Sequence, residues 1–165
     1  NTAPTRDDAL LRAKVGLDGG WSEEEPRPHW PFAFDLNLAA LVDKRDSAHV
    51  SAVESLRRLV MAQRRIVTSD YVLAEALTLT KARAGAVAAT RLLDRLESSH
   101  VVNMEWIGPQ RFESAKVFFR KHADHGYSFT DCASFVIMRE LALTQALTTD
   151  RHFVEAGFKV LLAVA

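Results

Sequence analysis

The sequence predicts an α/β fold, namely a three-layer α/β/α domain around a central parallel sheet of four to five strands. Short apolar runs rich in β-branched residues alternate along the chain with longer segments of helical spacing. Parallel neighbouring strands need a crossover, usually a helix, so this alternation favours a parallel sheet with helices on both faces. The chain has 165 residues, 48% apolar and 25% charged, which is typical of one compact domain.

The elements can be assigned in order from their residue patterns. Helix-breaking Gly85 divides one long helical stretch into two. Strands are predicted at 32–35, 65–68, 101–106, 146–149 and 159–164, and helical segments at 38–42, 47–63, 70–83, 85–99, 109–123 and 129–142.

Residues 1–31 differ from the rest of the chain, because three glycines at 16–20, an acidic run at 23–25 and three prolines at 26–31 oppose any long regular element. Only residues 8–15 have the pattern of a short helix. We therefore expect an N-terminal arm at 1–31 and a single domain at 32–165.

The charge balance and the cysteine content narrow the function classes. Lys plus Arg and Asp plus Glu both number 21, so nucleic acid would have to be bound by a local basic patch rather than by a global field. The single cysteine, Cys132, excludes an internal disulfide and a Cys-rich metal site, and we expect a reduced, packed thiol. No apolar run approaches the roughly 20 residues that cross a bilayer, so a cytoplasmic location and no membrane contact are expected.

Four carboxylates occupy positions that parallel α/β proteins use for function. Asp35 and Asp150 each follow an apolar strand, Asp131 opens a helix, and Glu75 has the apolar helical neighbours Val72 and Leu79. Ligands of open α/β sheets collect beyond the carboxyl ends of the strands. All four acids can reach that edge.

Each acid also has a structural interpretation of its own. The spacing from Ser128 to Asp131 resembles a capping box, and Asp150 can cap the segment after it. The combination is what favours a site, since a divalent Mg²⁺ or Mn²⁺ bound through oxygen relieves the repulsion in such a cluster. Such an ion activates water and stabilises charge on a phosphoryl oxygen, which predicts phosphodiester hydrolysis.

The residues at these positions resemble a known family. HGYSFTDCASFVIMRE at 125–140 and ALTTDRHFVEAGF at 146–158 are similar to the C-terminal half of PIN-domain nucleases, IVTSDYVLAEAL at 66–77 to their central motif, and FDLN at 34–37 to their opening motif. The match runs in order over residues 32–162. The resemblance implies a PIN fold, and a metal-dependent ribonuclease site formed by Asp35, Glu75, Asp131 and Asp150.

Many members of this family are VapC-type toxins that a partner antitoxin neutralises. The resemblance thus implies an RNA substrate and an antitoxin as partners, and exposed apolar faces would suit a homodimer. The metal is expected to be held chiefly by Asp35, Asp131 and Asp150, while Glu75 either completes the metal set or activates water.

Two features depart from the family pattern. Leu36 stands where relatives usually carry Thr or Ser, although Asn37 matches the polar residue that often follows. The arm at 1–31 has no counterpart, and one hypothesis is that it covers the active-site groove in cis.

Several other polar residues are candidates for supporting roles. Ser128, Thr130 and Ser134 flank Asp131 along the sequence and are candidates for hydrogen bonds to a carboxylate or to a water on the metal, with helix capping as the competing role of Ser128. For His152, packing or surface placement is expected instead, because oxygen-ligated Mg²⁺ sites need no imidazole.

Other function classes fit less well. The histidines lack HxxxH or HxxE spacing, which argues against a zinc hydrolase, and no GxxxxGK loop exists. A receiver-like phosphoacceptor domain needs adjacent acids after the first strand, where this chain has Asp35-Leu36. A catalytically inactive PIN-like domain that binds RNA or protein is the remaining alternative, and the Leu36 departure keeps it open.

Overall fold

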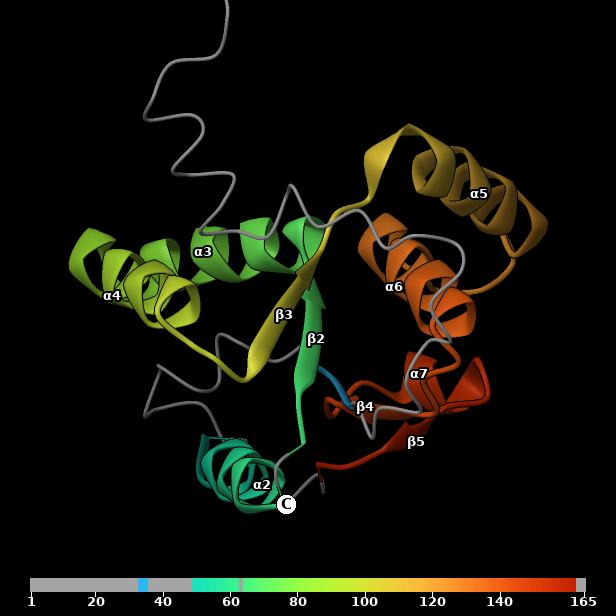
Figure 1. The fold of residues 1–165 in the computed structure, drawn as a ribbon. Helices are drawn as coiled ribbons and strands as arrows, with labels where there is room; N and C mark the ends of the chain where they lie inside the picture. Colours follow the sequence, from blue (N-terminus) through green and yellow to red (C-terminus); the bar gives the residue numbers. More distant parts are fainter. Residues whose placement is uncertain (1–32, 36–48, 63, 163–165) are drawn as a thin grey trace, which may run out of the picture.

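A computed structural model describes residues 33–35, 49–62 and 64–162, and over these ranges it confirms the predicted α/β class (Figure 1). Five parallel strands form one sheet in the order β3-β2-β1-β4-β5. The strands are β1 (Ala33–Asp35), β2 (Ile66–Ser69), β3 (Val102–Glu105), β4 (Gln145–Leu147) and β5 (Lys159–Val160). The helices are α2 (His49–Met61), α3 (Asp70–Ala84), α4 (Ala86–Glu97), α5 (Gly108–Lys121), α6 (Phe129–Glu140) and α7 (Arg151–Glu155).

The order of strands and helices agrees with the prediction. Gly85 separates α3 from α4 and has φ of +87°, a conformation that glycine adopts without a Cβ penalty. The short helix α7 was not predicted as an element. The predicted arm at 1–31, the helical segment at 38–42 and residues 36 and 37 lie outside the described residues.

Both faces of the sheet are buried, as a three-layer fold requires. Along β2, Val67 belongs to the large core formed with α3, α5 and α6, whereas its neighbour Ile66 belongs to a second cluster under α2. Ala146 and Leu147 of β4 divide in the same way. Successive side chains of a strand point to opposite faces, so this division places helices on each side of the sheet.

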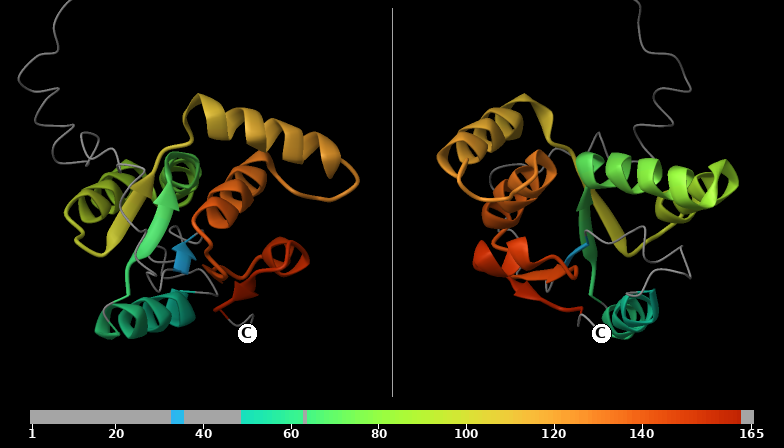
Figure 2. Two further views of the ribbon diagram at one scale, coloured as in Figure 1. Left: turned by 45° about the vertical axis from the view of Figure 1, so that its right-hand side comes forward. Right: turned by 180° about the vertical axis from the view of Figure 1, so that it is seen from behind.

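The helices form two pairs near the carboxyl end of β2. Figure 1 shows α3 beside α4 and α5 beside α6, with α2 near the other end of β2, and the two views of Figure 2 agree. The α5/α6 pair is fixed by aromatic side chains such as Phe118 and Phe135, whose ring centroids lie 5.8 Å apart. The large core therefore lies between these pairs and the sheet.

Among the described residues, no helix has both the length and the apolar character needed to cross a membrane.

Candidate metal centre

The carboxyl ends of the central strands define the edge at which the candidate site lies. β1 ends at Asp35, whose backbone is in register with Leu147 of the neighbouring β4. Three residues after Leu147 comes Asp150, the N-cap residue of α7. Since β1 and β4 are adjacent and parallel, the backbone positions of Asp35 and Asp150 lie at the same edge of the sheet.

Asp131 is held by the first turn of α6. Its backbone N–H donates to Ser128 Oγ at 3.0 Å, and the backbone N–H of Ser128 donates back to Asp131 Oδ2 at 2.8 Å. This is the capping box that the sequence predicted. The residue is 8% exposed, and its carboxylate is thus fixed in one orientation with lone pairs left over.

Asp150 is held in a similar way at the start of α7. Its Oδ1 accepts a hydrogen bond from the backbone N–H of His152 at 2.9 Å, and its own N–H donates to Thr148 Oγ1 at 3.0 Å. The capping interpretation of Asp131 and Asp150 is therefore correct, and it does not exclude a second role, because a capping carboxylate keeps further lone pairs.

The structure brings Asp131 and Asp150 together with His152. One ligand atom from each of the three residues lies within 4.8 Å of the others. His152 Nδ1 is 3.4 Å from Asp131 Oδ2 and 3.3 Å from Asp150 Oδ1. The expectation that His152 serves only packing or the surface missed this contact. His152 is the second residue of α7, two residues after the cap residue Asp150, and this closeness in sequence was the available signal.

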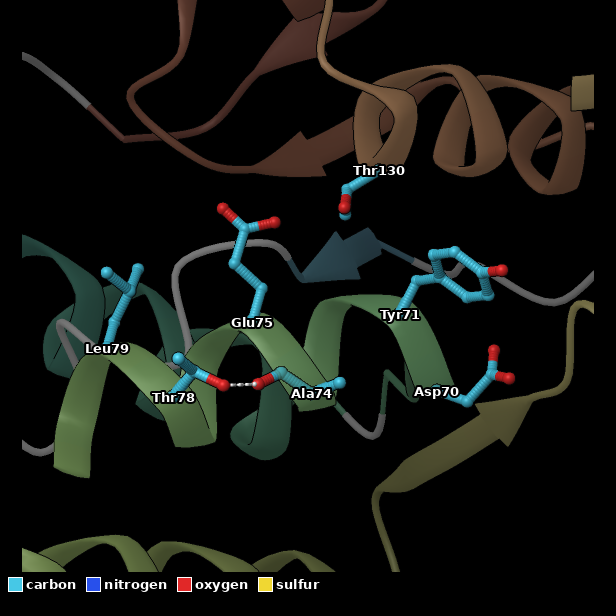
Figure 3. A pocket seen from close by; sticks show the side chains of 7 residues that line it. All are labelled: Asp70, Tyr71, Ala74, Glu75, Thr78, Leu79 and Thr130. Atoms are coloured by element: carbon cyan, nitrogen blue, oxygen red, sulfur yellow. Dashed lines mark hydrogen bonds between the residues drawn. The ribbon is translucent and has the colours of Figure 1, made fainter. Parts of the chain in front are cut away.

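Glu75 lies apart from this cluster. It is exposed on α3 rather than buried on an apolar face as its sequence neighbours indicated, and it lines an open groove of about 490 Å³. Figure 3 shows the Glu75 carboxylate and Thr130 of α6 pointing into the same space, with Tyr71 and Leu79 on the wall. In the described part of the chain, Glu75 is not among the side chains grouped within 4.8 Å.

The supporting residues take different positions. Ser128 makes the cap of α6, Thr130 faces the groove with Glu75, and Ser134 is fully buried and donates from Oγ to the backbone oxygen of Thr130 at 2.8 Å. Asn37 lies outside the described residues, and of Asp35 only the backbone is placed.

Cys132 follows Asp131 and is fully buried, as the sequence predicted for its thiol. Burial, and secondly the nearby charge of Asp131, raise the pKa of this thiol to about 11. The thiol is therefore neutral at ordinary pH and is a poor metal ligand.

The donor set of the cluster fits a divalent cation. Two carboxylates supply hard oxygen ligands, and His152 Nδ1 is buried with no hydrogen-bond partner among the described residues. Because this buried nitrogen has no partner and points at two carboxylates, a cation bound between the three side chains would provide the missing interaction.

Comparison with known proteins identifies relatives of the whole domain. The PIN domain model matches residues 38–159. The 23S rRNA-specific endonuclease VapC20 of Mycobacterium tuberculosis is 35% identical over 126 residues, which cover 73% of this chain and 88% of the relative. The crystal structure of VapC20, described as a Sarcin-Ricin loop cleaving toxin, superposes with a TM-score of 0.70 at 30% identity, covering 80% of this chain and 99% of that one.

A more distant structure supports the fold alone. FitAcB from Neisseria gonorrhoeae has a TM-score of 0.52 at 16% identity, over 79% of this chain and 96% of that one. From the family match and the similarity to VapC20, the chain belongs to the PIN-domain family.

Proposed function

We propose that this chain is a metal-dependent endoribonuclease of the VapC type that cleaves ribosomal RNA. The observation that carries the proposal is the convergence of Asp131 and Asp150 at the carboxyl edge of the sheet, in a chain 35% identical to an rRNA-specific endonuclease. Hydrolysis of a phosphodiester fits this edge, because charge that develops on the phosphoryl oxygens needs a cation there.

The metal in this proposal is Mg²⁺ or Mn²⁺, held by Asp131 and Asp150 with Asp35 from the neighbouring strand end. When bound, the ion supplies Lewis acidity and a lower pKa for water. The hydrogen bonds from Ser128 and from the His152 backbone hold the two aspartates in place before substrate arrives. Preorganised ligands lose little freedom on binding, which favours the transition state.

Glu75 has a separate role in this proposal. Its exposed carboxylate lies across the groove from Thr130. In this proposal the scissile phosphate and the attacking water lie in the groove between these two side chains. We assign to Glu75 the completion of the metal set or the acceptance of a proton from that water. The start of α6 is stabilised by two hydrogen bonds, one to the hydroxyl of Ser128 and one from the hydroxyl of Ser134 to the backbone oxygen of Thr130.

The groove beside Glu75 is the proposed path of the RNA. Tyr71 lines it, and aromatic rings stack well on the unpaired bases of RNA loops. The net charge of zero means that phosphate contacts must come from individual Lys and Arg side chains along this path. Ribosomal RNA has loops with unpaired bases that could stack on Tyr71, and it is the substrate of the relative VapC20.

A toxin of this type requires control, so we propose a neutralising antitoxin as the protein partner. The relative of known structure is described as a toxin, which is the basis for this partner. The hypothesis that residues 1–31 cover the groove in cis predicts that deleting residues 1–30 raises the nuclease activity. Unchanged activity in the deleted protein would remove the hypothesis.

The proposal is tested by incubating purified, partner-free protein with a panel of RNAs that includes 23S rRNA, in Mn²⁺ or Mg²⁺. We expect endonucleolytic products that EDTA abolishes. Asp131→Asn should slow cleavage by roughly 100-fold or more, because it removes a carboxylate ligand while retaining its size. Asp94→Asn, an exposed acid on α4, is the matched control and should cleave at the wild-type rate.

Two results would contradict the proposal. If the wild-type protein binds RNA without cutting any member of the panel, the inactive PIN-like domain replaces the enzyme. If Asp131→Asn retains full activity, RNA hydrolysis takes place at a different site.

A further inference from the structure

The side chain of His152 directs one ring nitrogen, Nδ1, at the two aspartates. No group among the described residues forms a hydrogen bond with this nitrogen. The Nδ1 atom is buried and makes no hydrogen bond, although it lies 3.4 Å from Asp131 Oδ2 and 3.3 Å from Asp150 Oδ1. A buried polar atom left without a partner is destabilising, because nothing compensates for its loss of hydration. This unpartnered nitrogen lies beside two carboxylates.

The ring has little freedom to turn away. Its backbone N–H is tied to Asp150 Oδ1, and its edge packs against Tyr127 with centroids 5.4 Å apart and planes at 78°. Behind it lies Gly126, where an added Cβ would come within 3.2 Å of Nε2. Nε2 thus faces the backbone of Gly126 and Nδ1 faces the carboxylates.

The separations suit shared coordination of one ion. Ligand atoms bound at about 2.1 Å in adjacent octahedral positions lie on the order of 3 Å apart. The two nitrogen-to-oxygen distances of 3.3 and 3.4 Å are close to that value, and all three ligand atoms lie within 4.8 Å of one another. An ion at their centre would give Nδ1 its missing partner.

We propose that Nδ1 of His152 is a metal ligand beside Asp131 and Asp150, and that this nitrogen makes the centre prefer a first-row transition ion such as Mn²⁺ over Mg²⁺. The inference rests on the proposed metal-dependent function and deepens it. Mg²⁺ strongly favours an all-oxygen set, whereas imidazole raises the relative affinity for transition ions. The competing role for His152 is neutralisation of the two carboxylates without any bond to the ion.

Electron spin echo envelope modulation of protein loaded with Mn²⁺ alone separates these roles. A directly bound imidazole gives ¹⁴N modulation, which we expect in the wild-type protein and which should disappear when its histidines carry ¹⁵N. His152→Gln should also lose it, because glutamine offers an oxygen donor of similar reach. His125→Gln is the matched control, since His125 also packs against Tyr127 but is absent from the cluster, and it should keep the modulation.

Metal affinities provide a second readout. In a titration of free Mn²⁺ by electron paramagnetic resonance, we expect His152→Gln to weaken Mn²⁺ binding at least roughly tenfold. Mg²⁺ binding, measured by its competition with Mn²⁺, should change by less than about threefold, because an oxygen donor remains.

The outcomes distinguish this inference from the proposed function. Wild-type protein that binds Mn²⁺ and cleaves RNA but shows no ¹⁴N modulation would overturn the role of His152 and leave the ribonuclease standing. Modulation that persists in His152→Gln would overturn it as well. A wild-type protein that binds no Mn²⁺ would overturn both. The isotope comparison uses the unsubstituted protein, so it shows whether a histidine binds the ion even if His152→Gln does not fold, and loss of the expected modulation difference would overturn the inference. Among the described residues, His152 is the histidine that lies in the cluster.

Discussion

The carboxylate of Asp131 both caps α6 and faces Asp150, and the two roles support each other. Oδ2 accepts from the backbone of Ser128, so the side chain cannot rotate away from the cluster without losing the cap. Removing a capping residue typically costs about 1 kcal/mol. A ligand that also caps is therefore held in place by the stability of its own helix.

The thiol of Cys132 allows a prediction about pH. Its folded-state pKa is raised from 9.0 to about 11, so its contribution to stability is complete below about pH 9 and is lost as the pH rises toward 11. We expect iodoacetamide to label Cys132 very slowly in the folded protein at about pH 9 and rapidly after unfolding in guanidinium, measured by mass spectrometry.

A Cys132→Ala variant is the control for the stability change. Its free energy of unfolding should fall less steeply between about pH 9 and 11 than that of the wild-type protein, since other groups still titrate there. Rapid labelling of the folded wild-type protein at about pH 9 would contradict the burial of this thiol.

Single residues show what the sequence can and cannot reveal about the site. The sequence placed Asp131 and Asp150 at one edge of the sheet because their positions depend on local structure, a helix start and a strand end. The closeness of His152 to Asp150 is local, but the orientation of its ring depends on Gly126 and Tyr127, which come from a different segment and could not be predicted from a local pattern. Glu75 is exposed because the groove between α3 and α6 opens there, although its sequence neighbours are apolar.

At the scale of elements, the alternation of strands and helices was predictable and their ends were less so. The strand expected at 159–164 is limited to Lys159–Val160, because it pairs in register only with Gln145 and Ala146 of β4. Apolar residues after it pack instead, as Leu162 does in the cluster under α2. An apolar run indicates burial, whereas the neighbouring strand decides how much of the run is paired.

Helix α3 contains a polar group that weakens it. Thr80 is 1% exposed, and its Oγ1 has no hydrogen-bond partner within the described part of the chain. We expect Thr80→Val to raise the free energy of unfolding by about 1 kcal/mol, because valine has the same shape without the unsatisfied hydroxyl. Urea denaturation followed by circular dichroism measures the change.

Thr78→Val on the same helix is the matched control for Thr80→Val. The hydroxyl of Thr78 is exposed and donates to the backbone oxygen of Ala74 at 2.8 Å, so its removal should bring no comparable gain. A loss of stability in Thr80→Val would mean that this hydroxyl has a partner in the folded protein.

At the scale of the whole molecule, the parallel sheet brings acids that are distant in sequence to the same edge of the fold. β1 lies between β2 and β4 and is parallel to both. The carboxyl ends of these three strands therefore lie side by side near Asp35, although the strands are separated by tens of residues in sequence. The sequence predicted this convergence because every strand needs a helical crossover to a parallel neighbour. Which acids come within ligand distance depends on packing between the helices, and only the structure resolves it.

The α5/α6 pair is tied to the edge of the sheet by one cation. Arg111 of α5 contacts Glu105 at the end of β3 at 2.9 Å, Glu140 at the end of α6 at 2.8 Å, and the backbone oxygen of Trp106 at 2.7 Å. The hydrogen bonds to Glu140 are the largest cause that raises the pKa of Arg111 above its ordinary value. Three elements thus share one guanidinium.

We expect Arg111→Met to lower the free energy of unfolding by about 1–3 kcal/mol, since Glu105 and Arg111 are each only 18% exposed and the carboxylate loses its cation. Urea denaturation is the appropriate measurement, because guanidinium salt would screen the ion pairs in both proteins. Arg58→Met is the control, because Arg58 pairs at 3.4 Å with Glu54 on the exposed face of α2, and its loss should lower the free energy of unfolding by less than about 0.5 kcal/mol.

Equal losses in the two variants would show that the Arg111 contacts do not join the helix pair to the sheet. A larger loss for Arg111→Met would show that this guanidinium stabilises the packing of α5 and α6 against the end of β3.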